Sequence, residues 1–266
     1  MLAAASFAIR AAVVFARGTP ASGLANAAAG ALVPVLLAAL SARLFRRRGL
    51  AIVTGGAGAV LPVFGFVAGG HRPESFDLVL LLGSAFLLLV AADRPSSNFA
   101  VLSGATLALA VRTQSSAWVF VPFLAAPLFD RRYPRRIGAH VVGSAILGLA
   151  LVLGPVLADA ALAGRRLDPR SWLSHGDPSP GAYGIAMTVL LGPLAAIGLA
   201  RAERRGAAWF CVGILTATML VLGIRGTLET VWTSVWDPIL LLYGLSGAFG
   251  AVSLARGARE LESEAA

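Results

Sequence analysis

The residues with chemical potential form a few small polar groups between long apolar stretches. The candidates for binding a substrate are His71, Glu74, Asp77, Arg112 and Arg225. Arginine suits phosphate because its planar guanidinium donates two parallel, charge-assisted hydrogen bonds to an anion. A water-filled cavity lined by these residues could bind an anionic or sugar ligand. The alternative is that they are ordinary solvated loop residues, and no residue is identified as catalytic.

Several common reaction centres have no counterpart in the sequence. It contains no glycine-rich phosphate loop, no histidine pair at helical spacing, no cysteine pair and no nucleophile elbow. Cys211 is the only cysteine, so an intramolecular disulfide is excluded. The sequence identifies no cofactor and shows no metal site, although a divalent metal remains possible.

The composition predicts the kind of element that must position these residues. Apolar residues make up 58% of the chain and charged residues only 13%, about half the charged share of a soluble domain. Several apolar runs approach the ~20 residues that a helix needs to cross a bilayer. We therefore expect an all-α, polytopic membrane protein, a bundle of about 8–9 transmembrane helices.

The apolar runs can be placed along the chain. Met1–Ala16 either crosses the membrane or lies in its interface, and Phe99–Phe129 is expected to be a hairpin of two short arms, tilted or bent at Pro122 and Pro127. The other expected spans are Ala25–Phe45, Leu50–Gly69, Ser75–Ala92, Ile137–Ala163, Ala182–Ala200, Ala207–Ile224 and about Val235–Leu254. They form one domain, residues 1–255, followed by a polar tail, residues 256–266.

The arginines predict the orientation of this bundle. If the loop after Phe45 is cytoplasmic and the spans alternate, fourteen arginines lie on the cytoplasmic side and seven outside, with Arg10 unassigned. Basic residues favour the cytoplasmic side, so the C-terminus is expected to be cytoplasmic and the candidate residues outside. The expected location is the plasma (inner) membrane. Because the arginines form short clusters between apolar runs, the net charge of +9 does not indicate a nucleic-acid partner.

Two segments carry a resemblance to a known family. Arg43–Phe66 reads RLFRRRGLAIVTGGAGAVLPVFGF, and Ser103–Arg132 contains SGATLALAVRTQS followed by an apolar helix with prolines and a basic turn. They resemble polyprenyl-phosphate-sugar glycosyltransferases of the C-type fold, such as protein O-mannosyltransferases and lipid A aminoarabinose transferases. The resemblance covers about residues 1 to 165 and implies a polyprenyl-phosphate sugar as a partner, besides membrane lipid.

The resemblance implies inverting sugar transfer on the outer side of the membrane. In that chemistry an acid deprotonates the acceptor, and cationic groups stabilise the departing phosphate. The family carries its catalytic acid in the first outer loop, whereas no Asp or Glu precedes Glu74 here. Glu74 and Asp77 follow a later span, so only the cationic half is visible, with Arg112 and Arg225 as candidates. We therefore expect a truncated or inactive relative of these enzymes.

Two other functions fit the same composition. One is a transporter or flippase-like protein that performs no covalent chemistry. The other is a structural subunit that packs against another membrane protein. Transporters often contain internal repeats and ionisable residues in mid-span. No convincing repeat is visible, and Arg10 is the only plausible mid-span charge, so the glycosyltransferase-like hypothesis leads.

Overall fold

The fold is described by a computed structural model. It describes residues 28–45, 48–69, 75–113 and 115–162, together with the short pieces 197–198, 206–207 and 209–210. Within these ranges the chain forms six helices and no strand. The expected all-α class is therefore confirmed for the described residues. The spans predicted before residue 28 and after residue 163 lie outside the described residues, apart from those short pieces.

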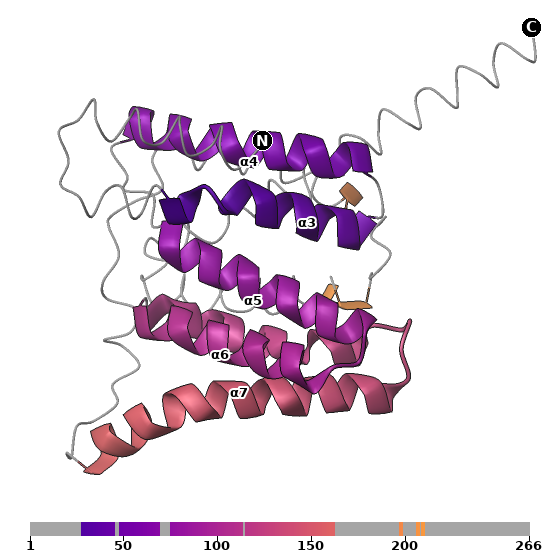
Figure 1. The fold of residues 1–266 in the computed structure, drawn as a ribbon, viewed down its shortest axis with the longest axis vertical. Coiled ribbons are helices and arrows are strands. Elements are labelled where there is room, and N and C mark those ends of the chain that lie inside the picture. The colour runs from indigo at the N-terminus through magenta and orange to yellow at the C-terminus, as the bar shows by residue number, and fades with distance from the viewer. Residues whose placement is uncertain are drawn as a thin grey trace, which may run out of the picture.

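The helices lie side by side in a row, with their axes nearly parallel (Figure 1). Successive helices run in opposite directions, and the order across the row is α4, α3, α5, α6, α7, with η1 packed against α6 and α7. Their bounds are α3 Val33–Phe45, α4 Arg48–Gly69, α5 Ser75–Asp93, α6 Ser97–Thr113, the 3₁₀ helix η1 Ser115–Phe129 and α7 Arg135–Leu162. Each begins within three residues of a predicted span or hairpin arm, except that α3 starts later than the predicted Ala25.

Apolar side chains at helical spacing join the first helices. Val33, Leu37, Leu40 and Leu44 are all buried and recur every three or four residues, so they lie on one face of α3. This face packs with Leu82 of α5. In water, the burial of such an apolar stripe is the main source of the free energy that holds neighbouring helices together. In lipid, close packing of the helices must supply that stabilisation instead.

Glycines allow α6 and α7 to approach closely. A Cβ atom added at Gly104 would lie 1.8 Å from the carbonyl oxygen of Ala145, and one added at Gly148 would lie 2.0 Å from that of Val101. No side chain fits into either space. The two backbones are therefore in direct contact, as in membrane helix pairs that use small residues at the interface.

A reciprocal pair of serines joins α5 and α6. The Ser84 hydroxyl donates to the carbonyl oxygen of Ser103 at 2.9 Å, and the Ser103 hydroxyl donates to the carbonyl oxygen of Ser84 at 2.9 Å. Both side chains are buried. Each hydroxyl thus has an acceptor, which avoids the cost of burying an unsatisfied polar group.

The second arm of the predicted hairpin differs from the expected tilted or bent α-helix. Residues Ser115–Phe129 form a 3₁₀ helix of 15 residues that contains Pro122 and Pro127. Proline has no backbone N–H and clashes with the preceding turn of an α-helix, so two prolines within 15 residues disfavour α-helical geometry. At about 2.0 Å per residue, the 3₁₀ helix extends about 30 Å, against about 22 Å for an α-helix of equal length.

Two segments are long and apolar enough to cross a membrane, as judged from the described residues. They are Ala28–Phe45 and Arg135–Ala158, and only 28% of the second is buried. Shorter apolar helical stretches occur at Gly49–Ala59, Leu78–Asp93 and Phe120–Phe129. This supports membrane association in outline, whereas the full set of eight or nine spans remains a prediction.

Candidate functional site

Two of the predicted site residues, Asp77 and Arg112, lie at the same end of the helix row. Arg112 lies in the last turn of α6 and is exposed. Asp77 is the third residue of α5, and because α5 and α6 are antiparallel neighbours, it lies at the same end as Arg112. The side chain of Asp77 lies outside the described atoms, and His71, Glu74 and Arg225 lie outside the described residues. The structure therefore describes the surroundings of one predicted site side chain, Arg112.

No acidic side chain that the structure describes lies within ion-pair distance of the exposed Arg112 guanidinium. The neighbouring Thr113 hydroxyl donates to the carbonyl oxygens of Leu109 and Ala110, at 3.1 and 3.0 Å, and so helps to satisfy the end of α6. A cation in the last turn also interacts favourably with the helix dipole. Arg112 is thus positioned at a helix end from which it can contact an anion.

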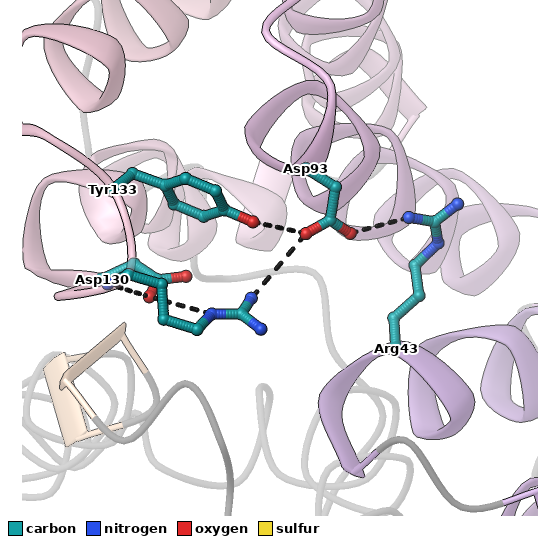
Figure 2. Close-up of polar contacts among 5 residues, drawn as sticks. Arg43, Asp93, Asp130 and Tyr133 are labelled. Atoms are coloured by element: carbon teal, nitrogen blue, oxygen red, sulfur yellow. Dashed lines mark hydrogen bonds and ion pairs between the residues drawn. The ribbon is translucent and has the colours of Figure 1, made fainter.

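At the opposite end the structure reveals a polar cluster that the sequence analysis missed. We call it the Asp93 cluster; it comprises Arg43, Asp93, Asp130, Arg132 and Tyr133 (Figure 2). Arg43 Nη1 lies 2.7 Å from Asp93 Oδ2, and Arg132 Nη2 lies 3.7 Å from Asp93 Oδ1. The Tyr133 hydroxyl donates to Asp93 Oδ1 at 2.5 Å. One carboxylate therefore joins the ends of α3 and α5 to the turn before α7.

Asp130 organises that turn from within. Its side chain is only 2% exposed, and its Oδ1 accepts hydrogen bonds from the backbone N–H and the Nε of Arg132, at 3.2 and 3.4 Å. A short acidic side chain that binds a backbone amide two residues later is typical of a turn. This turn directs Arg132 toward Asp93. The guanidinium also lies 5.5 Å from the centre of the Tyr133 ring, within cation–π range.

The charged and polar groups of the Asp93 cluster bind one another and so hold separate parts of the chain together. Both of its carboxylates accept hydrogen bonds from cationic or hydroxyl groups of the chain itself. Arg43 in addition lies over the ring of Phe86 at 5.0 Å. A signal was present in the sequence, because Asp93 and Asp130 each end an apolar run directly before an arginine. The three-way pairing could not be inferred, since the partners are about 40 to 50 residues apart.

The described residues contain no group of three or more His, Cys, Asp or Glu side chains that could hold a metal ion. Neither a protein-family model, nor a curated protein, nor a solved structure matches the chain.

Proposed function

We propose that this chain is a multispan integral membrane protein of the plasma (inner) membrane, with its arginine-rich end and its C-terminus in the cytoplasm. The supporting observation is where the charges lie. Every Arg and Asp in the described helices is among the first or last four residues of its helix. The end of the bundle that carries the Asp93 cluster holds arginines of the helix ends and of the turns between them. They are Arg43, Arg48, Arg94, Arg131, Arg132, Arg135 and Arg136.

The other end of the same helices carries a single described arginine, Arg112. Over the whole sequence the same orientation places fourteen arginines on the side of the membrane that carries the Asp93 cluster and seven on the other, as expected if basic residues remain on the cytoplasmic side. The uncharged middle of each helix is what a hydrocarbon layer requires, because a charge at the bilayer centre costs at least ~2.5 kcal/mol.

Exposed apolar side chains support the same placement. Ile52, Leu102, Ile146, Leu147 and Leu151 are all more than half exposed. They lie on α4, α6 and α7, so exposed apolar side chains occur on three helices of the row. Extended apolar surface of this kind marks an interface with lipid or with another protein.

The lengths of the hairpin arms also fit a bilayer. The 17 residues of α6 rise about 26 Å at ~1.5 Å per residue. The 15 residues of η1 rise about 30 Å in 3₁₀ geometry, close to the ~30 Å of hydrocarbon. The 3₁₀ conformation thus allows a segment that would be too short as an α-helix to cross the membrane.

Within this placement, we propose a glycosyltransferase-like protein that binds the phosphate of a polyprenyl-phosphate lipid at its outer face. The observation that carries this proposal is Arg112, which is exposed at the end opposite the arginine-rich end and has no described acidic partner. A phosphate at the outer membrane edge would complement its charge. The planar guanidinium would hold two phosphate oxygens at once.

The test is binding of a polyprenyl phosphate to the purified chain and to its Arg112→Lys and Arg112→Ala variants. Lysine keeps the charge but loses the bidentate geometry, so we expect binding to weaken by on the order of 1–2 kcal/mol in Arg112→Lys and further in Arg112→Ala. Arg94→Ala is the matched control, because Arg94 is exposed at the other end of the bundle. Equal binding by all four proteins, with unchanged thermal stability, would leave Arg112 as an interface anchor.

A further inference from the structure

Helix α7 has two sides of different character. Small and apolar residues on one side meet α6 and η1; these are Gly138, Val141, Ala145 and Gly148. The opposite side is exposed from Arg136 through Gly143, Ile146 and Leu147 to Leu151. The intervals of three, four and seven residues place this second set along a single helix face. In Figure 1 α7 lies at the edge of the described helix row.

This outward face combines a cation at one end with apolar surface along its length. Arg136 is exposed in the first turn of α7, and Ile146, Leu147 and Leu151 are 53%, 55% and 62% exposed. Gly143 lies between them and has open space where a side chain would project. The face thus offers a cation that can bind a phosphate, followed by open space at Gly143 and an apolar strip. A phospholipid presents its charged headgroup and its acyl chain in the same order.

The arginines at this end differ in their availability. Arg43 and Arg132 are engaged with the two aspartates of the Asp93 cluster. Arg136 is exposed, and no described acidic residue lies within ion-pair distance of it. Within the described residues its charge is therefore not neutralised by an acidic partner, whereas the paired arginines hold the fold together.

We propose that the outward face of α7 binds an acidic phospholipid, with the headgroup phosphate at Arg136 and an acyl chain along Ile146, Leu147 and Leu151. The inference rests on the membrane placement proposed above. At ~1.5 Å per residue, the stretch from Arg136 to Leu151 rises about 22 Å, enough to accompany a lipid through one leaflet of ~15 Å of hydrocarbon. The neighbouring His140 is one turn from Arg136, and its Nε2 lies 2.9 Å from Ser97 Oγ, so α6 helps to hold the imidazole near the headgroup.

The test measures which lipid lies beside α7 in the full-length chain. A bimane is attached to Leu147→Cys in a Cys211→Ser background, and the protein is reconstituted in phosphatidylcholine. Two samples are compared that contain the same fraction of lipid with brominated acyl chains. The brominated lipid is phosphatidylglycerol in one sample and phosphatidylcholine in the other. We expect brominated phosphatidylglycerol to quench more strongly, with an enrichment of up to roughly fivefold for one arginine near the surface. Arg136→Gln should remove the preference, whereas Arg94→Gln, an equal loss of charge at the same end, should retain it.

A second label at Leu102→Cys separates this inference from the membrane placement. Leu102, which lies on α6, is 51% exposed. Equal quenching of the Leu147 label by the two lipids, or a preference that survives Arg136→Gln, overturns the acidic-lipid site and leaves the membrane placement standing. Quenching at Leu102 but not at Leu147 also overturns the site, because another segment or a second copy would then cover α7. Absence of quenching at both labels overturns the membrane placement itself.

Discussion

The Tyr133 hydroxyl donates a 2.5 Å hydrogen bond to Oδ1 of Asp93. Oδ2 of the same carboxylate accepts a hydrogen bond from Arg43 at 2.7 Å (Figure 2). Tyr133 lies in the turn before α7, and Arg43 lies in the last turn of α3. These helices are not adjacent in the row (Figure 1), so Asp93 joins elements that apolar contacts alone do not bring together.

Replacement of Asp93 should therefore destabilise the bundle. In Asp93→Asn the charge is lost while the size is kept, and the ion pairs to Arg43 and Arg132 disappear. We expect the free energy of unfolding to fall by about 1.5–3 kcal/mol, the usual range for hydrogen bonds to charged groups. Thermal or denaturant unfolding in a mild detergent measures the change.

A double-mutant cycle with Arg43→Gln identifies the source of that loss. The two effects should be less than additive, because each substitution removes the same pair. Arg94→Gln is the control, since Arg94 is the exposed arginine directly after Asp93. Strict additivity of Asp93→Asn and Arg43→Gln would show that the contact contributes no coupling energy.

The close approach of α6 and α7 predicts opposite effects for two glycines of one helix. In Gly148→Ala the new Cβ would meet the Val101 carbonyl oxygen at 2.0 Å, so the backbones must separate. We expect a loss of about 1–3 kcal/mol, as for other overpacked interiors. Gly143→Ala, five residues earlier, meets no atom within 4 Å and should be neutral or stabilising by up to about 1 kcal/mol, because alanine favours the helix. Equal unfolding midpoints of the two variants would contradict the packing described here.

The serine pair predicts a small but measurable coupling between α5 and α6. Ser84→Ala and Ser103→Ala each remove one of the two hydroxyl-to-carbonyl hydrogen bonds, together with the 3.3 Å contact between the two hydroxyls. Each should cost about 0.6 kcal/mol, and at most ~1.7, which is the range found for side-chain hydrogen bonds inside membranes. Half-buried Thr106, whose hydroxyl donates to the carbonyl oxygen of Leu102 in its own helix, supplies the control variant Thr106→Ala. A Ser84→Ala loss no greater than that of Thr106→Ala would remove the serine pair as a stabilising contact.

The proposed orientation predicts the result of cysteine labelling. Arg131 and Thr113 are both exposed and lie at opposite ends of the bundle. In a Cys211→Ala background, an impermeant maleimide applied outside the cell should label Thr113→Cys, and Arg131→Cys should react only after the membrane is opened. Labelling of both positions from the same side is incompatible with a hairpin that crosses the membrane between them.

Several helices could be predicted from the sequence because their signal is local. The predicted Leu50–Gly69 and Ser75–Ala92 agree with α4 and α5 within two residues, since an uninterrupted apolar run bounded by polar residues indicates a helix without knowledge of its neighbours. The second arm of the predicted hairpin Phe99–Phe129 was expected in about this place, after a tip that included Ser115, but not in the 3₁₀ geometry of η1. Its prolines indicated only a disturbance of the α-helix.

The sequence by itself determined the helical class, the apolar middles of the helices and the concentration of arginines at one end, because these depend only on the order of residues along one segment. The tertiary structure decided which charges meet. Asp93 selects Arg43 and Tyr133, residues 50 and 40 positions away, and Gly104 and Gly148 bring two backbones into contact. Which residues become partners depends on the order in which the helices pack. That order brings together residues that are far apart along the chain.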